Sequence, residues 1–172
     1  MPDIAHITEL LNRSQAALNA AAGAIPPDYW RKPSRSGAWS AADVFAHLKM
    51  VEEVITDGAA RRIGSPAGKL PFWKRIHIPA RLAQFRQLKR QSPIPLDPAL
   101  VLDRDKSLAR HGALRSRTLA LLAEHRSRDL SGYYWKHPFF GYLNFYEWFA
   151  LIGHHELRHT KQLQEIIDFF QK

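Results

Sequence analysis

Four segments of this sequence place apolar side chains at the three- and four-residue spacing of an amphipathic helix, and none alternates convincingly as a strand. There is no internal repeat with a period of 20–50 residues. We therefore predict an all-α four-helix bundle that uses residues 1–172 as one domain. The expected helices cover residues 3–22, from Ser40 to about Gly64, from Asp97-Pro98 through Leu122, and 144–170.

The connections between these segments predict the order in which the helices pack. Residues 66–96, with a short helical candidate at 79–90, form a proline-rich connection of about thirty residues. This length allows the chain to cross along the bundle, which makes the second and third helices parallel. The shorter connections elsewhere, including a loop at 126–141, predict antiparallel neighbours.

Composition limits the chemistry that the chain can carry. The sequence has no cysteine, which excludes disulfides, thiolate zinc sites, iron–sulfur clusters and a cysteine nucleophile. Metal ligands must then come from His, Asp and Glu. The sequence begins without the pattern of a signal peptide and contains no run of eighteen apolar residues. We expect a soluble cytoplasmic protein without a transmembrane segment.

The net charge of +9 is concentrated in the long connection. No acidic residue lies between Asp57 and Asp97, whereas nine basic residues occur in the segment 61–90. This basic segment allows three interpretations: a solvated face, a surface that attracts an anionic substrate, or a contact with nucleic acid or membrane. No recognisable nucleic-acid-binding motif accompanies it, so we do not expect a nucleic-acid partner. The basic residues are Arg61, Arg62, Lys69, Lys74, Arg75, Arg81, Arg86, Lys89 and Arg90.

Three histidines occupy positions on the apolar faces of the expected helices, where Leu or Ile is the usual residue. His155 and His159 are four residues apart and share one helix face, and His47 lies in the stripe of the second helix. A buried polar group without a hydrogen bond costs about 1–3 kcal/mol. One divalent metal would satisfy all three imidazoles and keep an open coordination position, as catalytic sites do. The alternative is that each is a core histidine bonded to a neighbour.

The stretch His155-Glu156-Leu157-Arg158-His159 also spells the HExxH pattern of zinc peptidases. The peptidase interpretation fails because the only acids after His159 are Glu165 and Asp168, which lie on the same helix. Glu156 remains a candidate general base for a metal-bound water. Its other interpretation is a solvated charge beside Arg158 or Thr160, because it points about 100° away from His155.

Other polar residues near these motifs have weaker assignments. We place His154 on the flank of the site, and Gln162, one turn beyond His159, could hydrogen-bond a ligand. His137 belongs to a loop that could reach the mouth of the site, although a turn role is the alternative. Trp39 is expected to pack over the end of the bundle. The remaining histidines are expected at the surface, and they are His6, His77, His111 and His125.

Three motifs resemble the DinB-like superfamily over roughly residues 36–165. Gly37-Ala38-Trp39-Ser40 followed by His47-Leu48 is similar to the start of the second helix of that family. The stretch from His155 to Gln162 is similar to its fourth-helix pattern, His-x3-His followed three residues later by Gln. The run at 137–141 is similar to a loop before that helix in one subgroup. Thr160-Lys161 replaces the Arg-Gly that the family often carries, which weakens assignment to a subgroup.

The resemblance implies a four-helix bundle of up-down-down-up topology, usually a homodimer. It implies that His47, His155 and His159 bind a divalent metal, commonly zinc or nickel. Members include bacillithiol- and mycothiol-dependent transferases, a maleylpyruvate isomerase and proteins described as metal-dependent hydrolases. The expected activity is therefore hydrolysis of a small molecule, or transfer involving a low-molecular-weight thiol as cosubstrate. The alternative is a non-catalytic metal-binding or stress-related module.

Overall fold

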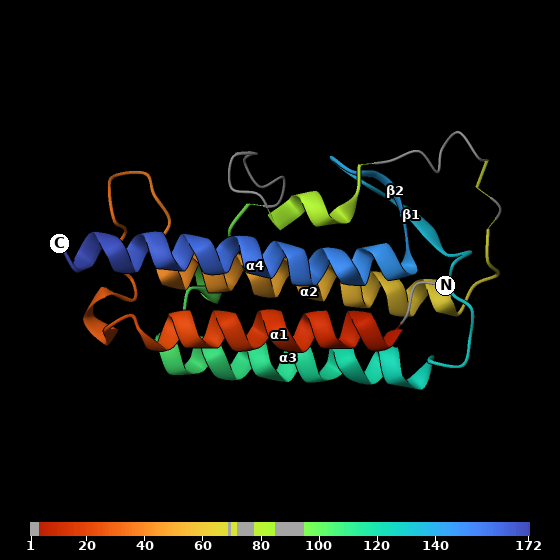
Figure 1. The fold of residues 1–172 in the computed structure, drawn as a ribbon, viewed down its shortest axis with the longest axis horizontal. Coiled ribbons are helices and arrows are strands. Elements are labelled where there is room, and N and C mark those ends of the chain that lie inside the picture. Colours follow the sequence, from red (N-terminus) through yellow and green to blue (C-terminus); the bar gives the residue numbers. More distant parts are fainter. Residues whose placement is uncertain (1–3, 69, 72–77, 85–94) are drawn as a thin grey trace.

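Four helices lie side by side along the longest dimension of the molecule (Figure 1). The computed structural model describes residues 4–68, 70–71, 78–84 and 95–172. The elements in chain order are α1 (Ile4–Gly23), η1 (Pro27–Tyr29), α2 (Ala41–Ile63), η3 (Ala80–Gln84), η4 (Pro98–Leu100), α3 (Arg104–Glu124), β1 (Tyr134–His137), β2 (Gly141–Asn144) and α4 (Phe145–Phe170).

The helix directions confirm the expected up-down-down-up topology. In Figure 1, α1 and α4 run toward the left and α2 and α3 run toward the right, so α2 and α3 are parallel. Helix α2 ends and α3 begins at opposite ends of the bundle, and the short helix η3 between them packs against α4. The long connection therefore acts as the predicted crossover. Among the described residues, no helix is long and apolar enough to cross a membrane.

The packing order corrects one expectation. The helices joined by the shorter connections, α1 with α2 and α3 with α4, are antiparallel, but α1 packs mainly against α4 and α3, while α2 packs against α3 and α4. Helices α1 and α2 therefore lie diagonally across the bundle. The connection at residues 24–40, with the short helix η1 inside it, is long enough to step across the bundle end. This order places α2 directly beside α4.

Local capping determines where the helices begin. The Ser40 side chain accepts a hydrogen bond from the backbone N–H of Asp43. The Asp43 carboxylate accepts in return from the N–H of Ser40, which completes a capping box. The predicted start of the third helix at Asp97-Pro98 is wrong. Asp97 caps only the turn η4, and the chain is extended at Val101. Asp103 then caps α3 by accepting from the N–H of Lys106.

A short antiparallel hairpin replaces much of the loop predicted at 126–141. Strands β1 and β2 pair Tyr134 with Asn144 and His137 with Gly141. Each strand has four residues, too few for an alternation to stand out from the sequence. Gly141 has φ +84°, a backbone conformation that favours glycine. The hairpin leads directly into α4.

Aromatic contacts attach the hairpin to the bundle. The Trp135 ring stacks on Trp148 of α4 with 5.0 Å between centroids, and its carbonyl accepts a hydrogen bond from the Trp148 indole. The Arg62 guanidinium of α2 lies 4.9 Å from the centroid of the same Trp135 ring. The hairpin is therefore fixed to both α2 and α4.

The described residues include only part of the basic segment. Arg61 and Arg62 lie in the last turn of α2, and Arg81 lies in η3. Of the helical candidate at 79–90, residues 80–84 form a 3-10 helix. The other basic residues, Lys69, Lys74, Arg75, Arg86, Lys89 and Arg90, lie outside the described residues, as does His77.

Candidate metal centre

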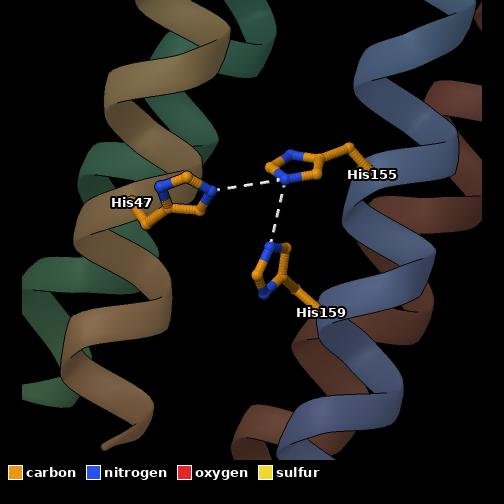
Figure 2. Close-up of side chains that lie close together, drawn as sticks. All are labelled: His47, His155 and His159. Carbon is orange, nitrogen blue, oxygen red and sulfur yellow. Dashed lines mark hydrogen bonds between the residues drawn. The ribbon is translucent and has the colours of Figure 1, made fainter. Parts of the chain in front are cut away.

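Three imidazoles from two helices converge in the middle of the bundle (Figure 2). His47 projects from α2, and His155 and His159 project from successive turns of α4. Capping boxes at Ser40 and Asn144 define where these two helices begin. The Nε2 of His155 lies 3.3 Å from Nε2 of His47 and 3.1 Å from Nε2 of His159. The structure thus brings together the three residues that the sequence selected.

These separations fit a metal ion. Zinc–imidazole bonds of about 2.0–2.1 Å in a tetrahedral site put neighbouring nitrogens roughly 3.3–3.4 Å apart. The two separations from Nε2 of His155 lie close to that edge length, and all three candidate ligand atoms lie within 4.8 Å of one another. Hydrogen bonds among the three imidazoles cannot satisfy all of them. Three Nε2 atoms that face one point do not have enough N–H donors and lone-pair acceptors in the right directions to pair with one another.

The imidazoles are neutral at physiological pH. Burial lowers the pKa of His47 to about 4. Burial also lowers the pKa of His155 to about 3, with further contributions from His47, Arg158 and His137. The pKa of His159 lies well below the ordinary value, chiefly because of burial and then of the neighbouring imidazoles. A neutral ring offers a lone pair to a metal, so the electrostatics favour a cation among them.

Neighbouring side chains orient the ligands. The Nδ1–H of His159 donates to Oε1 of Gln162 at 2.9 Å, which leaves the lone pair on Nε2 facing the other histidines. The Trp39 ring packs on His47 and His159, with centroid distances of 4.9 and 6.2 Å. Trp39 therefore covers the ligands as well as the bundle end. His47 and His159 are buried, and His155 is partly exposed, so the cluster remains accessible from solvent.

Glu156 lies elsewhere. It is 1% exposed, so its interpretation as a solvated charge is wrong. Its carboxylate accepts hydrogen bonds from Ser14 and from Nη2 of Arg115 at 3.1 Å. The histidine cluster includes no carboxylate from the described part of the chain. The step of about 100° from His155 turns Glu156 toward α1 and α3, which leaves its predicted role as general base without structural support.

Glu156 belongs to a buried ionic network that sequence analysis missed. Arg115 of α3 donates from Nε and Nη2 to both carboxylate oxygens of Glu52 on α2, at 2.9 and 3.0 Å. His111 lies 3.0 Å from Glu156, which corrects its expected surface position. Burial raises the pKa of Glu156, but His111 and the charge of Arg115 together hold it below the ordinary value. The sequence does carry a signal for this network, because charged residues stand at positions of the helical stripes that are otherwise apolar.

The other histidines fall into three environments. His6 is exposed, as expected, and His125 is partly exposed at the end of α3. His154 is partly buried, and its pKa is lowered by burial and then by Arg13 and His6 of α1, so its predicted flanking position stays a prediction. His137 lies at the end of β1 and packs against Trp148, seven residues before His155 on α4.

Known proteins are similar to this chain in sequence and in fold. The family model of the DinB superfamily matches residues 10–163. YuaE of Bacillus subtilis (strain 168) is 30% identical over 137 residues, which cover 79% of this chain and 81% of that protein.

Two solved structures are similar. TT2238, described as a four-helix bundle protein, has a TM-score of 0.63 and 24% identity, with 94% of this chain and 98% of that chain covered. YfiT from Bacillus subtilis, described as a probable metal-dependent hydrolase with an unusual four-helix bundle topology, has a TM-score of 0.66 and 16% identity, with coverages of 98% and 87%. At these identities the likeness establishes the fold.

Proposed function

This chain belongs to the DinB superfamily, and on that premise we propose that it is an enzyme that uses one divalent metal ion to act on a small molecule. His47, His155 and His159 would hold the ion. The observation that carries the proposal is the convergence of three neutral Nε2 atoms, with neighbouring separations of 3.1 and 3.3 Å. Three nitrogen ligands are typical of a catalytic site because they leave a coordination position for substrate.

The donor set suits zinc or nickel. Imidazole is a preferred ligand of both ions, whereas magnesium and calcium prefer oxygen. Three neutral ligands leave the full positive charge of the ion in the site. When bound, such an ion supplies a Lewis acid that lowers the pKa of a coordinated water or thiol. Gln162 orients His159 through a hydrogen bond, and the Trp39 ring covers His159.

Hydrolysis is the first candidate reaction. It is supported by the similarity to YfiT, which is described as a probable metal-dependent hydrolase. The site supports a small-molecule substrate, since the proposed ligands lie between packed helices and only His155 among them is partly exposed.

Transfer involving a low-molecular-weight thiol is the second candidate, and the position of Glu156 favours it. That carboxylate is engaged by Arg115 and Ser14, so it is unavailable to take a proton from water. A thiol has a pKa of about 8.5, against about 15.7 for water, and needs far less help to lose its proton. The thiol cosubstrate, like the homodimer implied by the family, is part of this proposal.

Metal analysis tests the central claim. Purified protein should carry about one zinc or nickel ion per chain after loading and desalting, and His47→Ala and His159→Ala should lose it. His6→Ala is the matched control, because His6 is an exposed histidine on α1. Equal metal content in all four proteins would refute the assignment of the ligands.

Activity assays separate the candidate reactions. Ester and amide substrates should be turned over without added thiol if the protein is a hydrolase, and only with thiol and a small electrophile if it is a transferase. Either activity should disappear with a chelator and return with metal. Full metal binding without any turnover would support the non-catalytic module instead.

A further inference from the structure

His137 is held in one tautomer by the hairpin turn. Its Nδ1 accepts hydrogen bonds from the backbone N–H groups of Phe139 and Phe140, at 3.0 and 3.1 Å. A nitrogen that accepts two N–H donors carries no proton, so in the neutral ring the proton resides on Nε2. The turn therefore presents an N–H from the far edge of the imidazole.

The ring lies on the same side of α4 as the metal ligands. It packs against Trp148, with 5.1 Å between the centroids. Trp148 precedes His155 by seven residues, about two turns, so the two side chains share a face of the helix. In Figure 1 the hairpin lies over the start of α4, upstream of the ligand-bearing turns.

The packing on Trp148 brings His137 to the ligand face of α4 without making it one of the ligands. His137 is among the groups that lower the pKa of His155, after burial and the charges of His47 and Arg158. It is not part of the three-residue ligand group. Within the described residues, the Nε2–H of His137 has no protein acceptor. A fixed donor without a protein partner at the edge of a site is suited to a bound molecule.

We propose that the Nε2–H of His137 donates a hydrogen bond to a carbonyl or carboxylate oxygen of the molecule held at the metal. His137 is then a specificity-determining residue that selects oxygen acceptors over ligands of similar charge that lack one. This inference rests on the proposed function, because it needs the metal at His47, His155 and His159.

The environment keeps this donor uncharged. Burial lowers the pKa of His137 to about 4, so the ring stays neutral at physiological pH. A neutral donor adds little repulsion toward the metal, whereas a second cation beside it would weaken metal binding. The two backbone hydrogen bonds also agree with neutrality, since a protonated ring could not accept them.

His137→Asn is the sharpest variant. The Asn Oδ1 can replace Nδ1 as acceptor for the turn, because Asn side chains accept hydrogen bonds from N–H groups two residues ahead, while the distal donor is lost. His137→Phe is the second variant: it keeps the ring against Trp148 and removes both nitrogens. Both variants keep the three ligands, so their cobalt spectra report whether the metal site is intact.

The experiment titrates cobalt-substituted protein with acetate and with thiocyanate, followed by visible absorption. We expect His137→Asn and His137→Phe to bind acetate about 3- to 10-fold more weakly than wild type, as for the loss of one hydrogen bond, with thiocyanate affinity unchanged. Equal acetate affinity in wild type and variants, or no acetate binding by cobalt-loaded wild type, would overturn the inference and leave the metal site standing. Absence of a bound-cobalt spectrum in wild type would overturn the proposed function and this inference together.

Discussion

Replacing Arg115 with Met tests whether the buried ionic network around this residue holds α2 and α4 together. Arg115 is 1% exposed and bridges Glu52 on α2 to Glu156 on α4, while Nη1 donates to the carbonyl of Leu11 on α1. Met fills a similar volume without the charge. The substitution therefore leaves two carboxylates, each no more than 2% exposed, without their cation.

The magnitude follows from the three carboxylate contacts, at 2.9, 3.0 and 3.1 Å. Removing one partner of a buried ion pair costs about 3–5 kcal/mol, because the remaining charge stays desolvated. Arg117→Met is the matched control on the same helix. Arg117 also pairs with α2, through Asp57 at 2.8 Å, but both side chains are largely exposed. Its loss should cost no more than about 1 kcal/mol.

Urea unfolding of the metal-free proteins measures both losses as free energies of unfolding. Adding Glu52→Gln and Glu156→Gln to Arg115→Met should recover part of the stability, because neutral amides are less costly to bury than unpaired carboxylates. A loss below about 1 kcal/mol for Arg115→Met, equal to that of Arg117→Met, would refute the buried-clamp argument. So would a triple variant less stable than Arg115→Met alone.

The structure supports three further predictions. Gln162→Leu should weaken metal binding about 10- to 100-fold, since His159 loses the acceptor that orients it; competition with a chromophoric chelator measures this, and unchanged affinity would contradict it. Gly153→Ala should lower the melting temperature, because its Cβ would lie 2.7 Å from Cγ of Leu10. Such overpacking costs about 1–3 kcal/mol, against about 1 kcal/mol gained in helix propensity, so a raised melting temperature would be the opposing result. The metal-free protein should lose stability as the pH falls from 6.5 to about 4, because the unfolded chain takes up a proton at His47 before the folded chain does. Urea midpoints across that range should shift steadily in wild type and less in His47→Phe, and a flat wild-type profile would count against this account.

The spacing of apolar residues was enough to predict features that lie within a single helix. The spacing of apolar residues located all four helices, and the four-residue separation of His155 and His159 placed both on one face. His47 was found because an imidazole interrupts an apolar stripe, a signal that needs no knowledge of its partner. The structure then supplied the separations between the rings.

Features that depend on several segments escaped the sequence. The partners of Arg115 are 63 and 41 residues away, so no local pattern links them. Glu156 looked solvated because the sequence shows its helix angle but not which helices surround it. The hairpin strands were too short to alternate visibly, and the diagonal placement of α1 and α2 depends on how a loop crosses the bundle end.

The ligands His47 and His155 are separated by 108 positions along the polypeptide. A ribosome that adds about 5–20 residues per second needs roughly 5–20 s to make that stretch. Throughout that interval His47 is already part of the nascent chain, whereas His155 and His159 have not yet been added. A metal ion held between these histidines, as proposed, would therefore be taken up after synthesis, and the cell's metal supply would act on a finished chain.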